Sequence, residues 1–250
     1  MKPLTALITG AAGGIGLALA ERLALTGHAL YLTDRDERVL DVARDLSAKG
    51  AAVWAETADL ALEADLTRLA RHARDALQGC AILVNCGGMT LKQDGGPIPL
   101  EALDVAAWEH VHRVNLVAPI VLCRELVPDM AQAGFGRVVN VASRAGRMHV
   151  PPAGLEYHAS KAGLIGVSRA LAGIYADRGV TINCVAPGRV DTAMTLATNQ
   201  ALLAQARAAV PARRFASADE IATAIEFLVS PGASYITGSC LDVNGGVYMN

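Results

Sequence analysis

Short apolar runs alternate with longer amphipathic segments along this chain, and that alternation constrains its fold more than any other feature. The runs are rich in apolar and β-branched residues and are mostly bounded by Gly, Asp or Asn, as strands are. Most lack polar alternation, which is typical of strands buried on both faces of a sheet. The expected strands are residues 4–9, 29–33, 51–55, 81–85, 137–142, 180–185 and 239–243.

The segments between these strands have the periodicity of amphipathic helices. They lie near residues 14–26, 36–49, 62–78, 101–132, 156–178 and 218–229. This order of elements predicts an α/β fold: a Rossmann-like, doubly wound parallel sheet of about seven strands with helices on both faces. No repeat or linker divides the chain, so we expect one dinucleotide-binding domain over residues 1–250. A Gly- and Pro-rich loop is expected at 89–100, and a substrate loop or lid at about 188–214.

Composition excludes several classes of protein. The chain has 250 residues, 52% of them hydrophobic, which is enough for a sizeable core. A net charge of −2 and an aromatic content of 4% give no basis for binding nucleic acid. Five cysteines without CxxC spacing favour neither a disulfide framework nor a metal site, and they fit a reducing compartment. No apolar stretch is long enough to span a bilayer, so we expect a cytoplasmic protein without membrane contact.

A glycine-rich turn, "ITGAAGGIG", joins the first expected strand to the first expected helix. Gly10, Gly14 and Gly16 would let the backbone turn tightly and approach a pyrophosphate, which the free N–H groups of the helix would bind. A glycine-rich turn without a ligand is the alternative. The position between a strand and a helix favours the nucleotide site.

Acidic and amide side chains follow the next strands. Asp34 ends the second strand, where a carboxylate can bind the adenosine ribose and repel a 2′-phosphate, so we expect NAD rather than NADP. Arg35 could instead hold a 2′-phosphate, and Asp34 could cap the following helix. Asp59 and Asn85 also lie at strand ends on the expected ligand edge, although Asp59 could be a helix cap.

Three polar residues lie at or after the fifth strand. Ser143 follows that strand at its carboxyl end. Tyr157 and Lys161 in "YHASK" are four residues apart and share one face of a helix. For this pentapeptide alone, a solvated surface pair is the simpler interpretation.

The whole set of motifs resembles the classical short-chain dehydrogenase/reductase family. The resemblance extends in the family's order from residue 9 to residue 246. It implies an NAD(P)-dependent oxidoreductase that transfers a hydride between the cofactor and a secondary alcohol or ketone. The elements that carry it are "TGAAGGIG", Asp59, "VNCGG", Asn115 in "VHRVNLVAP", Ser143, "YHASK", "NCVAPGRVDT" and "YITGSCLDVNGG".

The same resemblance implies a catalytic group of Asn115, Ser143, Tyr157 and Lys161. Tyr157 would exchange a proton with the alkoxide, its pKa lowered from about 10 by Lys161 and the nicotinamide. Ser143 would hydrogen-bond the carbonyl oxygen, and Asn115 would anchor a water chain that reaches Lys161. The cofactor-binding residues implied are Gly10, Gly13, Gly14, Ile15, Gly16, Asp34, Arg35, Asp59, Leu60, Asn85, Gly87, Tyr157, Lys161, Pro187, Gly188, Val190 and Thr192.

The substrate is less constrained. Our first expectation is an NAD-linked dehydrogenase of a polyol, a sugar-derived ketone or a hydroxy acid. The alternative is a 3-oxoacyl-acyl-carrier-protein reductase-like enzyme that uses NADP(H), because "VPARRFASADEIA" and "YITGSCLDVNGGVYM" are similar to segments of those reductases. A non-catalytic NAD-sensing regulator is the alternative from another class, and the intact group of four argues against it.

Two features depart from the family pattern, and one predicts an assembly. Cys86 stands where the family usually has asparagine, and the stretch between Gly88 and Trp108 is longer than in many members. The helix "ASKAGLIGVSRALAGIYA" is small or apolar almost all round and therefore needs burial on more than one side. Family members are commonly tetramers, so we expect a homotetramer that acts on a small-molecule substrate.

Overall fold

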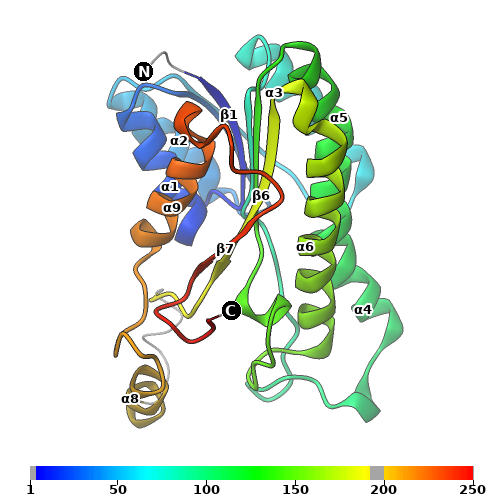
Figure 1. Ribbon diagram of the computed structural model, residues 1–250, viewed down its shortest axis with the longest axis vertical. Coiled ribbons are helices and arrows are strands. Elements are labelled where there is room, and N and C mark those ends of the chain that lie inside the picture. Colours follow the sequence, from blue (N-terminus) through cyan, green and yellow to red (C-terminus); the bar gives the residue numbers. More distant parts are fainter. Residues whose placement is uncertain (1–3, 192–199, 250) are drawn as a thin grey trace.

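One parallel sheet of seven strands forms the centre of the molecule (Figure 1). The computed structural model describes residues 4–191 and 200–249. The strand order is β3-β2-β1-β4-β5-β6-β7, and each neighbouring pair is parallel. The fold expected from the strand–helix alternation is thereby confirmed. The strands are β1 Thr5–Thr9, β2 Ala29–Asp34, β3 Val53–Thr57, β4 Ile82–Asn85, β5 Gly136–Val141, β6 Val180–Pro187 and β7 Cys240–Val243.

Helices cover both faces of the sheet (Figure 1). One face carries α1 Gly14–Leu25, α2 Arg38–Ala48 and α9 Ala218–Val229, and the other carries α3 Glu63–Leu77, α5 Ala118–Gln132 and α6 Leu155–Tyr175. Alternate residues of β1 feed the two cores: Ala6 and Ile8 pack on the first face and Leu7 on the second. Helices α4 Val105–His112 and α8 Gln200–Ala208 lie beyond the carboxyl ends of the strands.

The order of strands reverses between β1 and β4, which are direct neighbours in the sheet. After β1, the chain adds β2 and then β3 on one side of β1. It then crosses over and adds β4 on the other side of β1. A crevice outside the carboxyl ends of the strands at such a switch point is where doubly wound sheets bind ligands. The glycine-rich turn after β1 lies at this crevice.

The segment expected to be one helix over 101–132 is broken, and that expectation is corrected. A short turn, η1 Leu100–Ala102, precedes Asp104, whose carboxylate accepts the N–H groups of Ala106 and Ala107 at 3.3 and 3.0 Å and starts α4. A π-helical turn, η2 Arg113–Val117, then separates α4 from α5. The third strand also starts later than expected, because the backbone of residues 50–51 still closes the end of α2.

Three short 3₁₀ turns complete the elements: η3 Arg144–Gly146, η4 Ala176–Arg178 and η5 Pro231–Ala233. Across residues 4–191 and 200–249, no helix combines the length and the apolar character that a membrane span requires.

Candidate active site

The turn between β1 and α1 requires glycine at two positions, one for its backbone conformation and one for a close approach. Gly10 has φ +67°, and a Cβ there would lie 2.7 Å from the amide nitrogen of Gly87. A Cβ on Gly16 would lie 2.2 Å from the carbonyl oxygen of Gly10. The N-cap of α1 is Gly13, which provides no side-chain cap, and Gly13 and Gly14 both line the adjoining cleft, so the N–H groups of the first turn are available to a ligand. This arrangement fits the phosphates of a dinucleotide.

A cleft of about 550 Å³ opens beside this turn. His110 of α4 and Val114 of η2 also line it, and the sequence analysis missed both. The residues expected to bind the cofactor that line this cleft are Gly10, Gly13, Gly14, Asp34, Arg35, Asp59, Leu60 and Gly87.

Asp34 lies at the end of β2 with both carboxylate oxygens engaged. One oxygen accepts the N–H of Ala12 in the glycine turn at 3.1 Å, and the other accepts the N–H of Asp36 at 3.1 Å. Each oxygen has a second lone pair for a ribose hydroxyl. Arg35 is exposed at the same cleft, whereas Arg38 is paired with Asp36 at 2.8 Å.

Asp59 is not the cap of α3, because that helix begins after Leu62 without a side-chain cap, and cofactor binding by Asp59 stays a prediction. Its carboxylate accepts the N–H of Ala61 at 2.9 Å and so shapes the turn before α3, and the residue also lines the cleft. Asn85 differs from expectation. Its side chain is buried, donates to the side-chain oxygen of Asn140 at 2.7 Å and does not line the cleft. A contact between the Asn85 backbone and the cofactor stays a prediction.

A second cavity of about 320 Å³ continues from the first, and both are lined by Cys86, Gly88 and Met89. The structure brings together here residues from the ends of five separate segments. The expected site residues that line this cavity are Ile15, Ser143, Tyr157, Lys161, Pro187, Gly188 and Val190. Gly16 lies beneath the turn rather than in either lining, and Thr192 lies outside the described residues.

Ser143 and Tyr157 both line this cavity. Ser143 caps the η3 turn by accepting the N–H of Ala145 at 3.1 Å, and its hydroxyl also hydrogen-bonds the Tyr157 side chain. Burial raises the pKa of Tyr157, and the hydrogen bond with Ser143 opposes that rise. The net shift of the Tyr157 pKa is therefore upward here, whereas the lowering expected from Lys161 together with the nicotinamide stays a prediction for the cofactor-bound protein.

Lys161 is 3% exposed and donates from its Nζ to the carbonyl oxygen of Val141 at 2.8 Å. Its Nζ lies 5.6 Å from the centre of the Tyr157 ring. Burial lowers the pKa of Lys161 to about 8, so its charge changes near neutral pH. The two side chains therefore share one face of α6, as their spacing predicts.

Asn115 lies in the π-helical turn η2 and holds the start of the 89–100 loop. Its Oδ1 accepts the N–H of Met89 at 2.8 Å, and its Nδ2 donates to the carbonyl oxygen of Met89 at 2.8 Å. The Nδ2 also lies 3.1 Å from the Ser160 hydroxyl on α6. A Cβ on Gly88 would lie 3.3 Å from both Asn115 Oδ1 and Lys161 Nζ, so a larger residue would crowd these two side chains. A water chain from Asn115 stays a prediction.

Two further residues hold the elements of the site together, and these contacts were not foreseen from the sequence. Glu156 is 1% exposed, and its carboxylate accepts the Thr90 hydroxyl and the N–H of Leu91, each at 3.2 Å. It thereby ties the 89–100 loop to α6. Asn140 on β5 donates to the Ser168 hydroxyl at 2.9 Å, which fixes the same helix to the sheet. Neither residue belongs to a motif that a single sequence displays.

Comparisons with known proteins agree with this geometry. A family model described as enoyl-(acyl carrier protein) reductase matches residues 10–248. Nodulation protein G of Rhizobium sp. (strain N33) is 39% identical over 98% of this chain and 96% of its own length. The acetoacetyl-CoA reductase of Allochromatium vinosum is 36% identical over 98% of each chain. A 3-oxoacyl-[acyl-carrier protein] reductase with bound NAD from Brucella melitensis superposes with a TM-score of 0.90 at 28% identity, covering 99% of this chain and 92% of the other.

Proposed function

The chain belongs to the classical short-chain dehydrogenase/reductase family, and from that premise we propose that it reduces the 3-oxo group of an acyl thioester with NADH. As a member it is an oxidoreductase that acts on CH–OH and keto groups with a nicotinamide cofactor. The observation that carries the proposal is the cavity in which Ser143, Tyr157 and Lys161 meet the end of the dinucleotide cleft. A purely NAD-sensing protein would have no need of this proton-transfer group.

The bound nicotinamide supplies the hydride, and the protein manages the oxygen that becomes an alkoxide. The Ser143 hydroxyl hydrogen-bonds the carbonyl oxygen and stabilises its developing charge. Tyr157 gives that oxygen a proton from its phenol, which burial keeps protonated until the alkoxide forms. Lys161, with a pKa of about 8, can replace the proton on the phenol near neutral pH.

The proposed substrate class is inferred from the names of the relatives. Our first expectation of a polyol, a sugar-derived ketone or a hydroxy acid gives way to the alternative of a 3-oxoacyl reductase. Acetoacetyl-CoA reductase and 3-oxoacyl-[acyl-carrier protein] reductase are the names of two proteins that match nearly the whole chain. Both names describe reduction of a ketone beside a thioester.

The choice of NADH over NADPH rests on Asp34. The negative charge of the Asp34 carboxylate would repel a 2′-phosphate on the cofactor. This repulsion would be strongest if no cation neutralised the phosphate. Arg38 is already paired with Asp36, so compensation among the described residues that line the cleft would fall to Arg35. The Brucella melitensis reductase, whose structure holds NAD, also fits this choice.

We also propose a homotetramer built on the helices that bear the site. Apolar side chains remain exposed on these elements: Val117 in η2, and Leu155 and Ile174 on α6. Burial in a subunit interface would remove them from water. Size-exclusion chromatography with light scattering should give four times the protomer mass, and a monomer mass would contradict the proposal.

Steady-state reduction of acetoacetyl-CoA with each cofactor tests the proposed function. Wild-type protein should turn it over with a higher kcat/KM for NADH than for NADPH. Asp34→Ala should reverse or erase that preference, because the carboxylate is lost. Asp41→Ala, on the exposed side of α2, is the matched control and should leave the ratio unchanged. Absence of turnover with either cofactor contradicts the proposed substrate, and an NADPH preference contradicts the role of Asp34.

A further inference from the structure

Helix α6 carries a second polar pair directly beside Tyr157 and Lys161. Glu156 and Ser160 are four residues apart and therefore share one face of the helix. Glu156 is 1% exposed and Ser160 is fully buried. The helix thus brings an acid–base pair to the catalytic cavity and a buried pair, displaced by one residue, to a neighbouring segment of the chain.

The Glu156 carboxylate holds the start of the 89–100 loop through one of its oxygens. Its Oε1 accepts the Thr90 hydroxyl and the N–H of Leu91, each at 3.2 Å. The other oxygen fills the space over Gly154, where a Cβ would lie 2.2 Å from Oε2. The carboxylate is therefore enclosed between the loop and the residue that precedes α6.

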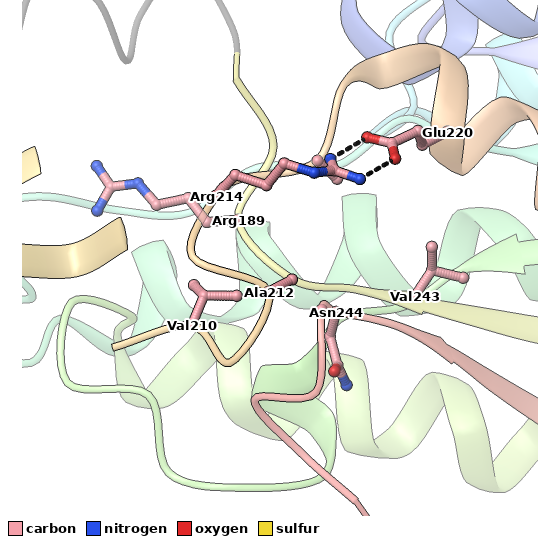
Figure 2. Close-up of a pocket in the computed structure, with 9 residues that line it drawn as sticks. Arg189, Val210, Ala212, Arg214, Glu220, Val243 and Asn244 are labelled. Atoms are coloured by element: carbon pink, nitrogen blue, oxygen red, sulfur yellow. Dashed lines mark hydrogen bonds and ion pairs between the residues drawn. The ribbon is translucent and has the colours of Figure 1, made fainter. Parts of the chain in front are cut away.

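No cation offsets the buried charge of Glu156. Among residues 4–191 and 200–249, no basic side chain forms an ion pair with it. Its position in the first turn of α6 places it at the positive end of the helix dipole. Figure 2 shows the contrasting case of Glu220, whose two oxygens accept hydrogen bonds from the Arg214 guanidinium at 2.6 and 2.7 Å. A carboxylate buried with neutral partners costs free energy, and proteins keep such groups mainly where function requires them.

The loop that Glu156 holds forms one wall of the catalytic cavity. Thr90 lines this cavity together with Tyr157, so its hydrogen bond to Glu156 joins the wall to the helix that bears the phenol. Asn115 separately holds the backbone of Met89. Loss of the Glu156 carboxylate would therefore free Thr90 and leave Met89 anchored. A displacement of about 1 Å in the groups that orient a substrate can lower the rate by about 10²-fold.

We propose that Glu156 is a positioning residue: through Thr90 it fixes the wall of the catalytic cavity at the distance from Tyr157 that the ketone requires. This inference rests on the proposed function for the identity of the ketone substrate. Neither Glu156 nor Thr90 lines the dinucleotide cleft, whereas Thr90 lines the catalytic cavity. Loss of the contact should therefore impair use of the ketone and leave NADH binding intact.

Two substitutions of Glu156 separate its hydrogen bonds from its charge. Glutamine keeps one oxygen with two lone pairs, which can accept both donors that now bind Oε1. Methionine has a similar length and accepts neither. With saturating NADH, Glu156→Met should lower kcat/KM for acetoacetyl-CoA about 10- to 100-fold, and Glu156→Gln should restore most of it. The KM for NADH should stay unchanged in both variants.

Gly154→Ala tests the position of the carboxylate while Glu156 itself remains. The added Cβ would occupy the space of Oε2 and displace the carboxylate from the position in which it binds Thr90. Residue 154 has a φ of −71°, which alanine adopts without strain. This variant should show the same fall in kcat/KM as Glu156→Met, and wild-type kinetics would contradict the inference. Gly173→Ala, on the same helix, adds a Cβ with no atom within 4 Å and is the matched control.

Glu226→Met controls for the loss of a partly buried acid elsewhere. Glu226 lies on α9, on the opposite face of the sheet from α6, and pairs with Arg22 at 2.7 Å, so its removal should leave the kinetics unchanged. Unchanged kcat/KM in Glu156→Met overturns the inference, as does an equal weakening of NADH binding or an equal loss in Glu156→Gln. Should Glu156→Met fail to fold by circular dichroism, Thr90→Val, which removes the hydroxyl, is measured in its place and must show the same loss.

Failure of the proposed function is a separate result. If wild type does not reduce acetoacetyl-CoA with either cofactor, that function fails, and hydrogen–deuterium exchange of the NADH-loaded protein then tests the positioning role. Exchange of the Leu91 amide, which now donates to Oε1, should be faster in Glu156→Met and should stay slow in Glu156→Gln. Equal exchange in wild type and both variants overturns the inference.

Discussion

Replacement of Lys161 by methionine should change the pH dependence of stability in the cofactor-free protein. Burial lowers the pKa of this side chain from 10.5 to about 8. Between these two values the unfolded chain keeps the proton and the native protein has released it. The free energy of unfolding therefore rises with pH across this window, and the stabilisation is lost as the pH falls through about 8. Methionine has a similar shape and no proton to release.

The size of the effect follows from the two pKa values. A tenfold change in proton concentration is worth about 1.4 kcal/mol when the two states differ by one proton. Between pH 7 and 9 the lysine thus adds about 1.4 kcal/mol to the free energy of unfolding. Burial also raises the pKa of the thiols of Cys80, Cys86, Cys123 and Cys184 to about 12, which destabilises the native state at alkaline pH. That effect is common to both proteins and cancels in the difference.

Urea unfolding of wild type and Lys161→Met at pH 7, 8 and 9 measures this difference directly. Both proteins are compared at one concentration, because any assembly would otherwise alter their apparent stability. The wild type should gain about 1.4 kcal/mol over the variant between pH 7 and 9. A constant difference across that range would refute the argument, since it would mean that Lys161 keeps its ordinary pKa despite its burial.

Three further substitutions test other parts of the site. Tyr157→Phe should lower kcat by about 10²- to 10⁴-fold while NADH still binds by fluorescence titration, and a retained rate would refute the proton-transfer role. Asn115→Ala leaves the N–H and the carbonyl oxygen of Met89 without their side-chain partner. The free energy of unfolding measured in urea should fall by about 2 kcal/mol. An unchanged free energy would mean that water replaces the amide. Gly16→Ala places a Cβ 2.2 Å from the backbone oxygen of Gly10 and should abolish NADH binding. In the control Gly173→Ala the added Cβ has no atom within 4 Å, so NADH should bind normally. Equal NADH binding by the two variants would contradict the assigned turn.

The strands were predictable because their burial produces short apolar runs in the sequence. β4 and β5 are buried throughout, and their largely apolar or β-branched character sets them apart from the amphipathic helices. The glycine turn was predictable as well, since glycines at this spacing between a strand and a helix are typical of a dinucleotide site. The break within 101–132 was not predicted, because α4, η2 and α5 follow one another without a glycine or proline between them to mark the change of helix type.

The contacts that complete the site depend on side chains brought together from distant segments. Glu156 precedes the Tyr157 motif and has the sequence context of a solvated acid, yet the fold buries it against the 89–100 loop. Asn85 has the position of a ligand at a strand end, yet it turns into the sheet toward Asn140. The direction of the shift in the Tyr157 pKa also depends on how deeply the fold buries the phenol.

The π-helical turn η2 makes the chain sensitive to its exact length at one place. Such a turn holds one residue more than the α-helix it interrupts, so a single-residue deletion within 113–117 can restore an uninterrupted α-helix. Every residue before the deletion would then rotate by about 100° relative to α5. Helix α5 would keep its place on the sheet, and a deletion after Asn115 would turn that residue away from Met89. We expect such a deletion to disrupt the candidate site while the rest of the protein stays folded.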